Sequence, residues 1–323
     1  MENDGRILEQ ETLKEDSMRI LVTGGGGFIG ANLVRALLAQ GDEVVVLDLA
    51  QKPQLLADCK SLTYIRGDIG SEVDIYRTMA VNRVEGIFHL GALMAGACEA
   101  DPPTAFRVNF RSTQVLLDAA VTFGVKKFFF MSSISVYDPG QPEPVPQDGL
   151  KNPPNIYGQT KLAGEHLLNW YTKHHGIDSR GIRPTWVWGP NRQHGLTTLY
   201  TTAMINSIAQ GGDVFIDNPD ERGDWLYVHD CIKAMLLVWN AKAPKERIYT
   251  ICGSVHTVRE VAEIAIKHCP QARVRFSEQA AAPSPYAVRF DDSAATRDFG
   301  WKPDYSIEDS VKDHLLTIQT GKP

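Results

Sequence analysis

The chain has 323 residues, with 33 Lys and Arg against 39 Asp and Glu and a formal charge of -6. This length suits one domain with a smaller added lobe. The acidic balance argues against a nucleic-acid partner. Five widely spaced cysteines without a C-x-x-C pair predict neither a disulfide framework nor a zinc site, so no metal is expected. The first 17 residues are polar and no stretch is apolar enough to span a bilayer, so we expect a cytoplasmic protein with no membrane partner.

The first predicted strand, around Ile20, leads into a glycine-rich turn that opens a helix. Gly24 allows the backbone to turn, and Gly27 leaves room for phosphate oxygens near the main chain. Gly30 permits the helix to pack closely on its strand. The free N–H groups at this helix start favour an anion, so the stretch predicts binding of a dinucleotide pyrophosphate.

Further apolar strands are predicted at residues 43–49, 62–65, 86–90 and 127–131, with helices between most of them. Alternation of fully apolar strands with amphipathic helices predicts an α/β fold, a Rossmann-type doubly wound parallel sheet with a smaller C-terminal substrate lobe. We expect a flexible extension at 1–17, an NAD-binding domain at 18–182, and a mainly substrate-binding lobe at 183–323 with some segments returning to the sheet. Long helices are expected at 105–123 and 157–174, and a proline-rich loop at 138–155.

Two aspartates follow strands where a cofactor's adenosine would lie. Asp48 ends the second strand, where its carboxylate accepts hydrogen bonds from ribose hydroxyls and repels a 2'-phosphate, which favours NAD over NADP. A plain strand-end cap is the alternative. Asp68 follows the third strand and is placed against the adenine amino group, with Ile69 packing on the ring, although a simple turn explains the same residues.

Tyr157 and Lys161 are four residues apart at the start of a predicted helix and so share one face. Ser133 leaves the end of a buried strand, where active sites of open parallel sheets form. A tyrosine, a lysine and a serine make an acid/base set for hydride transfer, in which cations lower the phenol pKa toward neutrality. The alternative is a solvated helical pair. His89, at the end of the fourth strand, is predicted to be a core histidine.

In their order along the chain, these pieces resemble the extended short-chain dehydrogenase/reductases of the NAD-dependent epimerase/dehydratase type, over residues 18–305. Phe28 stands where single-domain members carry glycine, which indicates the branch with an added lobe. The motifs that carry the resemblance are Thr23-Gly24-Gly25-Gly26-Gly27-Phe28-Ile29-Gly30, Gly67-Asp68-Ile69, His89-Leu90-Gly91-Ala92, Ser132-Ser133-Ile134-Ser135, Tyr157-Gly158-Gln159-Thr160-Lys161 and Gly300-Trp301-Lys302-Pro303.

The resemblance implies that Tyr157 is the general acid/base, that Lys161 lowers its pKa and binds the nicotinamide ribose, and that Ser133 orients the reacting hydroxyl. It also implies a homodimer formed through the helices at 105–123 and 157–174. Residues 94–98 and 185–188 would line the substrate site. The remaining implied cofactor residues are Phe28, Ile29, Leu90, Gly91, Ala92, Asn109 and Pro184, and the implied substrate residues include Met94, Thr185, Trp186 and Arg222.

One departure bears on the substrate. Nucleotide-sugar epimerases usually carry Arg-Asp-Phe where this chain has Arg222-Gly223-Asp224-Trp225, so the arginine is displaced by one residue. Our first hypothesis is an NAD-dependent oxidoreductase or epimerase acting on a secondary hydroxyl of a sugar or sugar nucleotide through a keto intermediate. The alternative is a dehydrogenase of a small hydroxy acid or amino alcohol. A non-catalytic dinucleotide sensor is a remote third, disfavoured by the intact acid/base set.

Overall fold

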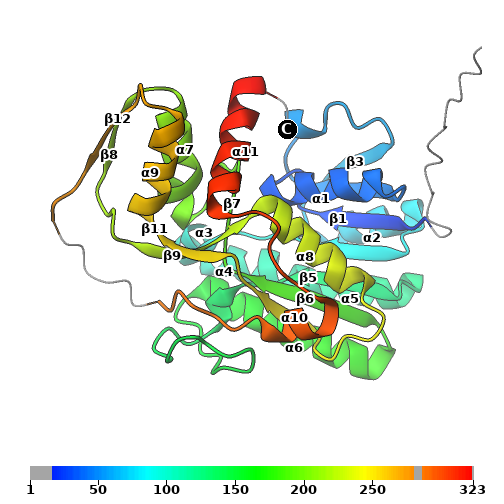
Figure 1. Cartoon of the computed structure of the whole chain (residues 1–323). Helices are drawn as coiled ribbons and strands as arrows, with labels where there is room; N and C mark the ends of the chain where they lie inside the picture. Colours follow the sequence, from blue (N-terminus) through cyan, green and yellow to red (C-terminus); the bar gives the residue numbers. More distant parts are fainter. Residues whose placement is uncertain (1–16, 280–285, 322–323) are drawn as a thin grey trace, which may run out of the picture.

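The protein is described here by a computed structural model that covers residues 17–279 and 286–321, so the expected N-terminal extension lies, apart from Ser17, outside the described residues. Seven parallel strands form the central sheet in the order β10-β6-β5-β4-β1-β2-β3, which confirms the predicted fold class (Figure 1). The strands are β1 (Arg19–Thr23), β2 (Glu43–Asp48), β3 (Leu62–Arg66), β4 (Gly86–His89), β5 (Lys127–Met131), β6 (Asp178–Pro184) and β10 (Ile248–Ile251).

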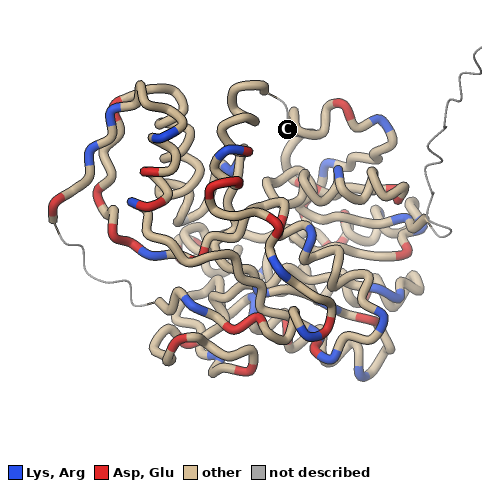
Figure 2. Tube along the Cα trace, viewed as in Figure 1, with Lys and Arg blue, Asp and Glu red and all other residues tan. Residues whose placement is uncertain are grey.

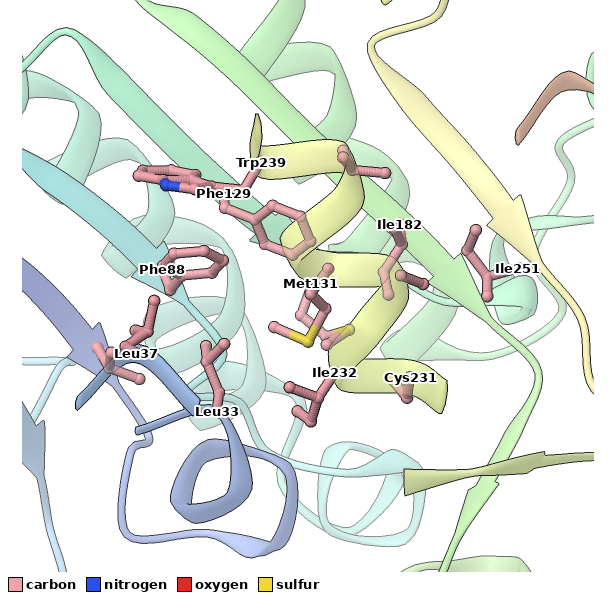
Figure 3. Close-up of a cluster of buried hydrophobic side chains, with 14 of the residues drawn as sticks. Leu33, Leu37, Phe88, Phe129, Met131, Ile182, Cys231, Ile232, Trp239 and Ile251 are labelled. Carbon is pink, nitrogen blue, oxygen red and sulfur yellow. The ribbon is translucent and has the colours of Figure 1, made fainter. Parts of the chain in front are cut away.

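Helices cover both faces of this sheet, which is why its strands are apolar on both sides. On one face α1 (Phe28–Ala39), α8 (Val228–Asn240) and α10 (Ser293–Phe299) bury a core that includes Phe88, Phe129 and Trp239 (Figure 3). On the other face α2 (Glu72–Asn82), α5 (Ser112–Phe123) and α6 (Ile156–His175) cover Ile87 and Phe128. The strand β10 and the helices α8 and α10 lie beyond residue 183 in the chain, yet they complete the sheet and its cover.

The remainder of the C-terminal part forms a separate lobe around its own core, seen beside the sheet in Figure 1. Two small sheets support it. In one, β9 (Arg222–Tyr227) pairs parallel with β7 (Trp186–Trp188) and antiparallel with β11 (Ser254–Thr257); in the other, β8 (Asp213–Ile216) pairs with β12 (Arg273–Phe276). The helices of the lobe are α7 (Met204–Ala209), α9 (Val258–His268) and α11 (Ile307–Thr320).

The helix expected at residues 105–123 differs from the prediction at its start. It begins three residues earlier as α4 (Pro102–Ala105), because Asp101 is its cap and accepts the Thr104 N–H at 3.2 Å. A proline in the first turn loses no helical hydrogen bond. The helix then passes through a π-helical segment, Phe106–Arg111, which buries Asn109, before it continues as α5.

Two broader expectations can be compared with this structure. Residues 138–155 hold no helix or strand, which confirms the predicted loop, and Val145 forms one bridge with Phe290. Figure 2 shows Lys and Arg interspersed with Asp and Glu along the trace, in keeping with a modest net charge. Among the described residues, no helix is long and apolar enough to cross a membrane.

Candidate active site

The glycine-rich turn lies where the strand order reverses, since β1 is flanked by β2 on one side and β4 on the other. Ligands of open α/β sheets bind at this point. Gly24 has a φ of +68°, and a Cβ there would lie 2.7 Å from the Gly91 Cα. A Cβ on Gly30 would lie 2.1 Å from the Gly24 carbonyl oxygen. Larger side chains at these positions would force the turn apart, and Gly27 caps α1 directly beside it.

Asp48 holds the glycine turn at the end of β2. Its Oδ2 accepts the Gly26 N–H at 2.8 Å, and its Oδ1 accepts the Ala50 N–H at 2.9 Å. Burial, together with the Asp48 charge, raises the pKa of the neighbouring Tyr64 to about 12. Asp48 therefore serves as a strand-end cap. A carboxylate has about four acceptor positions, so the two bonds leave room for others, and its contact with ribose hydroxyls stays a prediction.

Asp68 has partners that the sequence did not reveal. Its Oδ2 accepts from Arg107 Nη1 at 2.9 Å, and its Oδ1 accepts the Gly70 N–H at 2.7 Å. An adenine amino group would therefore share this carboxylate with Arg107. Ile69 is buried in the core below the sheet, and its Cδ1 lies 2.7 Å from where a Gly91 Cβ would be. Sequence reasoning missed Arg107 because it lies 39 residues away from Asp68.

The loop after β4 is held by side chains from three elements. Leu90 and Gly91 donate their N–H groups to the Thr23 carbonyl and hydroxyl oxygens at 3.2 and 3.3 Å. The buried Asn109 carboxamide accepts the Leu93 N–H at 2.7 Å and donates to Thr160 Oγ1 of α6 at 3.2 Å. These bonds support the segment that contains Leu90, Gly91 and Ala92, so Asn109 holds this loop from below.

His89 lies directly beneath this loop and is a satisfied core histidine, as predicted. Its ring nitrogens lie 2.7 Å from Thr23 Oγ1 and 3.0 Å from Thr113 Oγ1. Burial, with a smaller contribution from Lys161, lowers the pKa of His89 to about 3. The imidazole is therefore neutral near pH 7.

Ser133 and Tyr157 meet because the start of α6 lies against the turn after β5. Asn155 caps α6 by accepting the Gly158 N–H at 2.8 Å. A Cβ on Gly158 would lie 2.2 Å from the Ser135 carbonyl oxygen, so glycine is needed for this close approach. Tyr157 is buried, and Ser133, whose Oγ accepts the Ser135 N–H at 3.1 Å, lies close enough to the Tyr157 phenol to act on its pKa.

The electrostatics of Tyr157 differ from the sequence expectation. Burial raises its pKa to about 12, while the Ser133 hydrogen bond and the charge of Arg192 act in the lowering direction. Lys161 Nζ donates to the Met131 carbonyl oxygen at 2.7 Å and lies 5.7 Å from the Tyr157 ring centroid. Burial lowers the pKa of Lys161 to about 8. The protein's own groups therefore do not lower the pKa of the Tyr157 phenol toward 7, because the effect of burial is larger than that of the Arg192 charge.

The predicted substrate residues lie in two places. Thr185 and Trp186 lie where β6 of the central sheet meets the lobe, and Met94 and Arg222 are exposed. Thr185 follows Pro184 at the end of β6, and its hydroxyl donates to Asp224 Oδ1 at 2.9 Å. The ring of Trp186 covers Gly223, where a Cβ would lie 2.2 Å from a ring carbon.

Met94 is exposed at the start of α3 (Ala95–Ala100). Arg222 is exposed at the start of β9, paired with Thr257, and none of the described contacts joins it to Tyr157.

Two features of the site were not predicted from the sequence. Arg192 follows the breakers Gly189 and Pro190, and nothing in its local pattern predicts that its charge acts on Tyr157. Behind the serine turn, Glu165 and Arg183 form a buried bidentate ion pair with distances of 2.7 and 2.8 Å. This pair joins α6 to β6, and so it holds the helix that carries Tyr157 against the sheet.

The fold and this constellation define a Rossmann-type NAD-binding oxidoreductase with an added lobe. The sequence profile of the NAD dependent epimerase/dehydratase family matches residues 20–252, and the chain belongs to this family. It is an NAD-dependent epimerase/dehydrogenase of the extended short-chain dehydrogenase/reductase type, and its cofactor is NAD. The glycine turn with Asp48 beside it fits that cofactor, since Gly24 and Gly30 leave no room for a Cβ and so keep the turn tight at the start of α1, where backbone N–H groups favour a pyrophosphate.

Three similar proteins divide between two activities. The mitochondrial L-threonine 3-dehydrogenase of Bos taurus is 30% identical over 311 residues, covering 93% of this chain and 82% of the relative. The UDP-glucose 4-epimerase of Mycolicibacterium smegmatis is 31% identical over 255 residues, covering 76% and 80%. The UDP-glucose 4-epimerase of Thermus thermophilus, solved in complex with NAD, superposes with a TM-score of 0.81 at 27% identity and covers 94% of this chain and 99% of that structure.

Proposed function

We propose that the protein is an NAD-dependent dehydrogenase that oxidises a secondary hydroxyl of a small hydroxy acid or amino alcohol. Ser133 holds the substrate oxygen, and Tyr157 takes the hydroxyl proton at its phenolic oxygen in the phenolate form. Burial alone disfavours that form, and the positive charge of the nicotinamide in bound NAD would favour it. Bound NAD supplies the acceptor for the hydride. Lys161 directs its ammonium along the wall below Tyr157, where it would hold a ribose hydroxyl. The contact of Ser133 with Tyr157 at the carboxyl end of the sheet carries this proposal.

The size of the substrate is inferred from the surroundings of Gly223 in the lobe. Epimerases of nucleotide sugars usually place an arginine for substrate phosphate where this chain has Gly223, and the Trp186 ring occupies the space beside that glycine. The arginine of this motif, Arg222, is exposed. A small substrate needs no phosphate contact there. The similarity to L-threonine 3-dehydrogenase over 93% of the chain supports the same substrate class.

A sugar-nucleotide epimerase is the second candidate, because a UDP-glucose 4-epimerase is also similar, with 31% identity over 76% of this chain. In that reaction Tyr157 would return the proton after the keto intermediate rotates, and no net NADH would form. Incubation of the purified protein with NAD and a panel of hydroxy acids, amino alcohols and nucleotide sugars separates the candidates. We expect NADH to accumulate steadily with a small hydroxy acid or amino alcohol. Inverted product stereochemistry without NADH would favour the epimerase instead.

We also propose a homodimer through the α5 and α6 helices. Tyr171 of α6 hydrogen-bonds Asp118 of α5, so the ends of the two helices lie together. Near this contact the neighbouring residues Val121, Phe123 and Trp170 are exposed although large and apolar. A second copy packed on this surface would remove that area from water. Analytical ultracentrifugation at micromolar concentration is expected to show a dimer, and a monomer would contradict it.

The compartment is inferred from the cysteines. All five are free thiols. Free thiols are typical of reducing compartments, so we infer a cytoplasmic protein. Expression with a compartment-resolved fluorescent tag tests this inference.

A further inference from the structure

The helix that carries Tyr157 has a third polar side chain on the face that meets the turn after β5. Tyr157, Lys161 and Glu165 are four residues apart in α6 and therefore share one face. Lys161 Nζ donates to the Met131 carbonyl oxygen at 2.7 Å, and Glu165 Oε1 accepts from the Ser132 hydroxyl at 2.5 Å. Glu165 therefore binds the residue that directly precedes the serine of the acid/base set.

The ion pair of Glu165 also reaches the other end of this turn, the serine turn (residues 132–137). Arg183 Nε and Nη2 donate to the two carboxylate oxygens of Glu165 at 2.7 and 2.8 Å, and Arg183 Nη1 donates to the Tyr137 hydroxyl at 3.0 Å. The four side chains of this network, Ser132, Tyr137, Glu165 and Arg183, are all buried. One buried ion pair thus binds the first and the last residue of the serine turn.

The middle of the serine turn is held mainly by its own bonds. It forms a short 3-10 helix, Ile134–Val136, with Ser133 as its cap. Ser133 Oγ accepts the Ser135 N–H at 3.1 Å. This bond lies within the turn, so it does not fix the turn against α6. The bonds at the two ends, together with the close approach at Gly158, therefore set where Ser133 stands relative to Tyr157.

Resting on the proposed function, in which Ser133 holds the substrate oxygen, we propose that Glu165 and Arg183 are positioning residues for that serine. Hydrogen bonds to charged groups are stronger than neutral ones, and a fully satisfied buried network is rigid. Because Glu165 lies on the same helix as Tyr157, the network ties the serine turn to the element that carries the acid/base. The pair acts through Ser133 and does not itself touch the substrate.

Two substitutions test this role without breaking the ion pair. Ser132→Ala removes the hydroxyl that binds Glu165, and Tyr137→Phe removes the hydroxyl that binds Arg183, while the pair keeps its own two hydrogen bonds. We expect each to lower kcat about tenfold with KM for NAD unchanged, because a small misplacement of a substrate-holding group slows the reaction. Ser310→Ala, which removes an equally buried hydroxyl from α11, is the control and should keep full kcat.

A double-mutant comparison separates positioning from a merely structural role. If the network acts through Ser133, Ser132→Ala should have little further effect on kcat in a Ser133→Ala background. A loss by the same factor in both backgrounds would overturn the proposal, and so would an unchanged kcat in Ser132→Ala. Near-normal turnover of Ser133→Ala would instead contradict the role of the serine in the proposed function.

Amide hydrogen exchange tests the same network without any substrate. We expect the amides of the serine turn to exchange about tenfold faster in Ser132→Ala and in Tyr137→Phe than in the wild type, because the turn loses one of its two end contacts. Unchanged exchange in both variants would overturn the proposal whether or not any compound reacts. Faster exchange in a protein that turns over no compound of the panel would support the hold of the network on the turn and place the failure in the proposed function.

Discussion

The sheet and the C-terminal lobe of this protein differ in how far apart in the sequence their contacting residues lie. In the sheet, strand and helix follow each other along the chain, and the glycine turn, Asp48 and the Tyr157 helix each take their place through local geometry. In the lobe, Thr185 hydrogen-bonds Asp224 of another strand, and Trp186 covers Gly223, so its walls form between distant segments. From this comparison we propose that the reaction chemistry resides on the sheet half and the choice of substrate on the lobe. Changes in the first should affect stability and kcat, and changes in the second should affect KM.

The largest effect is expected from the buried ion pair of the sheet half. Glu165→Gln leaves the Arg183 guanidinium without its charged partner, and breaking a buried pair in this way costs about 3–5 kcal/mol. Urea denaturation at pH 7 measures the free energy of unfolding. Asp220→Asn is the control, because its pair with Arg259 is exposed and should contribute about 0–1 kcal/mol. Equal losses of unfolding free energy in the two variants would show that the buried Glu165–Arg183 pair does not stabilise the sheet half more than an exposed pair does.

Removal of the phenolic hydroxyl should remove the chemistry and leave the cofactor in place. We expect Tyr157→Phe to lower kcat on the order of a hundredfold or more, the usual contribution of a positioned acid/base. NADH binding, followed by fluorescence, should be retained. Tyr76→Phe on α2 is the matched control and should keep full turnover. Near-normal turnover in Tyr157→Phe would end the acid/base assignment.

A change in the lobe should alter substrate binding more than turnover. A Cβ on Gly223 would lie 2.2 Å from the Trp186 ring, so Gly223→Ala displaces the indole from its present position. We expect KM for the substrate to rise about tenfold with a smaller change in kcat, because small displacements of a substrate wall misalign the substrate. Gly212→Ala, whose nearest neighbour lies 3.8 Å away, is the control. A fall in kcat without a rise in KM would contradict the proposal that the lobe governs substrate binding.

The smallest effect concerns pH and the junction between the halves. Burial raises the pKa of Asp224 to about 6, against hydrogen bonds from the Gly253 N–H and the Thr185 hydroxyl that lower it. The native state then binds more protons than the unfolded state between pH 5 and 7, so the stability contributed by this group falls as pH rises. Asp224→Asn removes this dependence. The free energy of unfolding of the variant and of the wild type is measured at pH 5 and at pH 7. On going from pH 5 to pH 7, the variant should gain about 1 kcal/mol of stability relative to the wild type. The same difference in stability at both pH values would contradict the raised pKa of Asp224.

Much of the sheet half could be predicted from local sequence. The strand at 127–131 coincides with β5, and the helix expected at 157–174 is α6 extended by one residue at each end. Tyr157 and Lys161 lie on that helix, and Ser133 lies in the turn that it touches. Periodicity of apolar residues and the caps of helices are properties of neighbouring residues, which is why the pattern identified these elements.

The sequence by itself determined the glycine turn, the parallel sheet and the placement of Tyr157 and Lys161 on one helix face, because backbone conformation and helical periodicity act over a few residues. Only the tertiary structure decided that Arg107 meets Asp68, that Lys161 faces the Met131 carbonyl, and that Arg192 is the cation acting on Tyr157. These contacts join residues 30 or more positions apart in the chain, and charge and burial there depend on how whole elements pack. The pKa of Tyr157 followed burial rather than the lysine beside it in sequence.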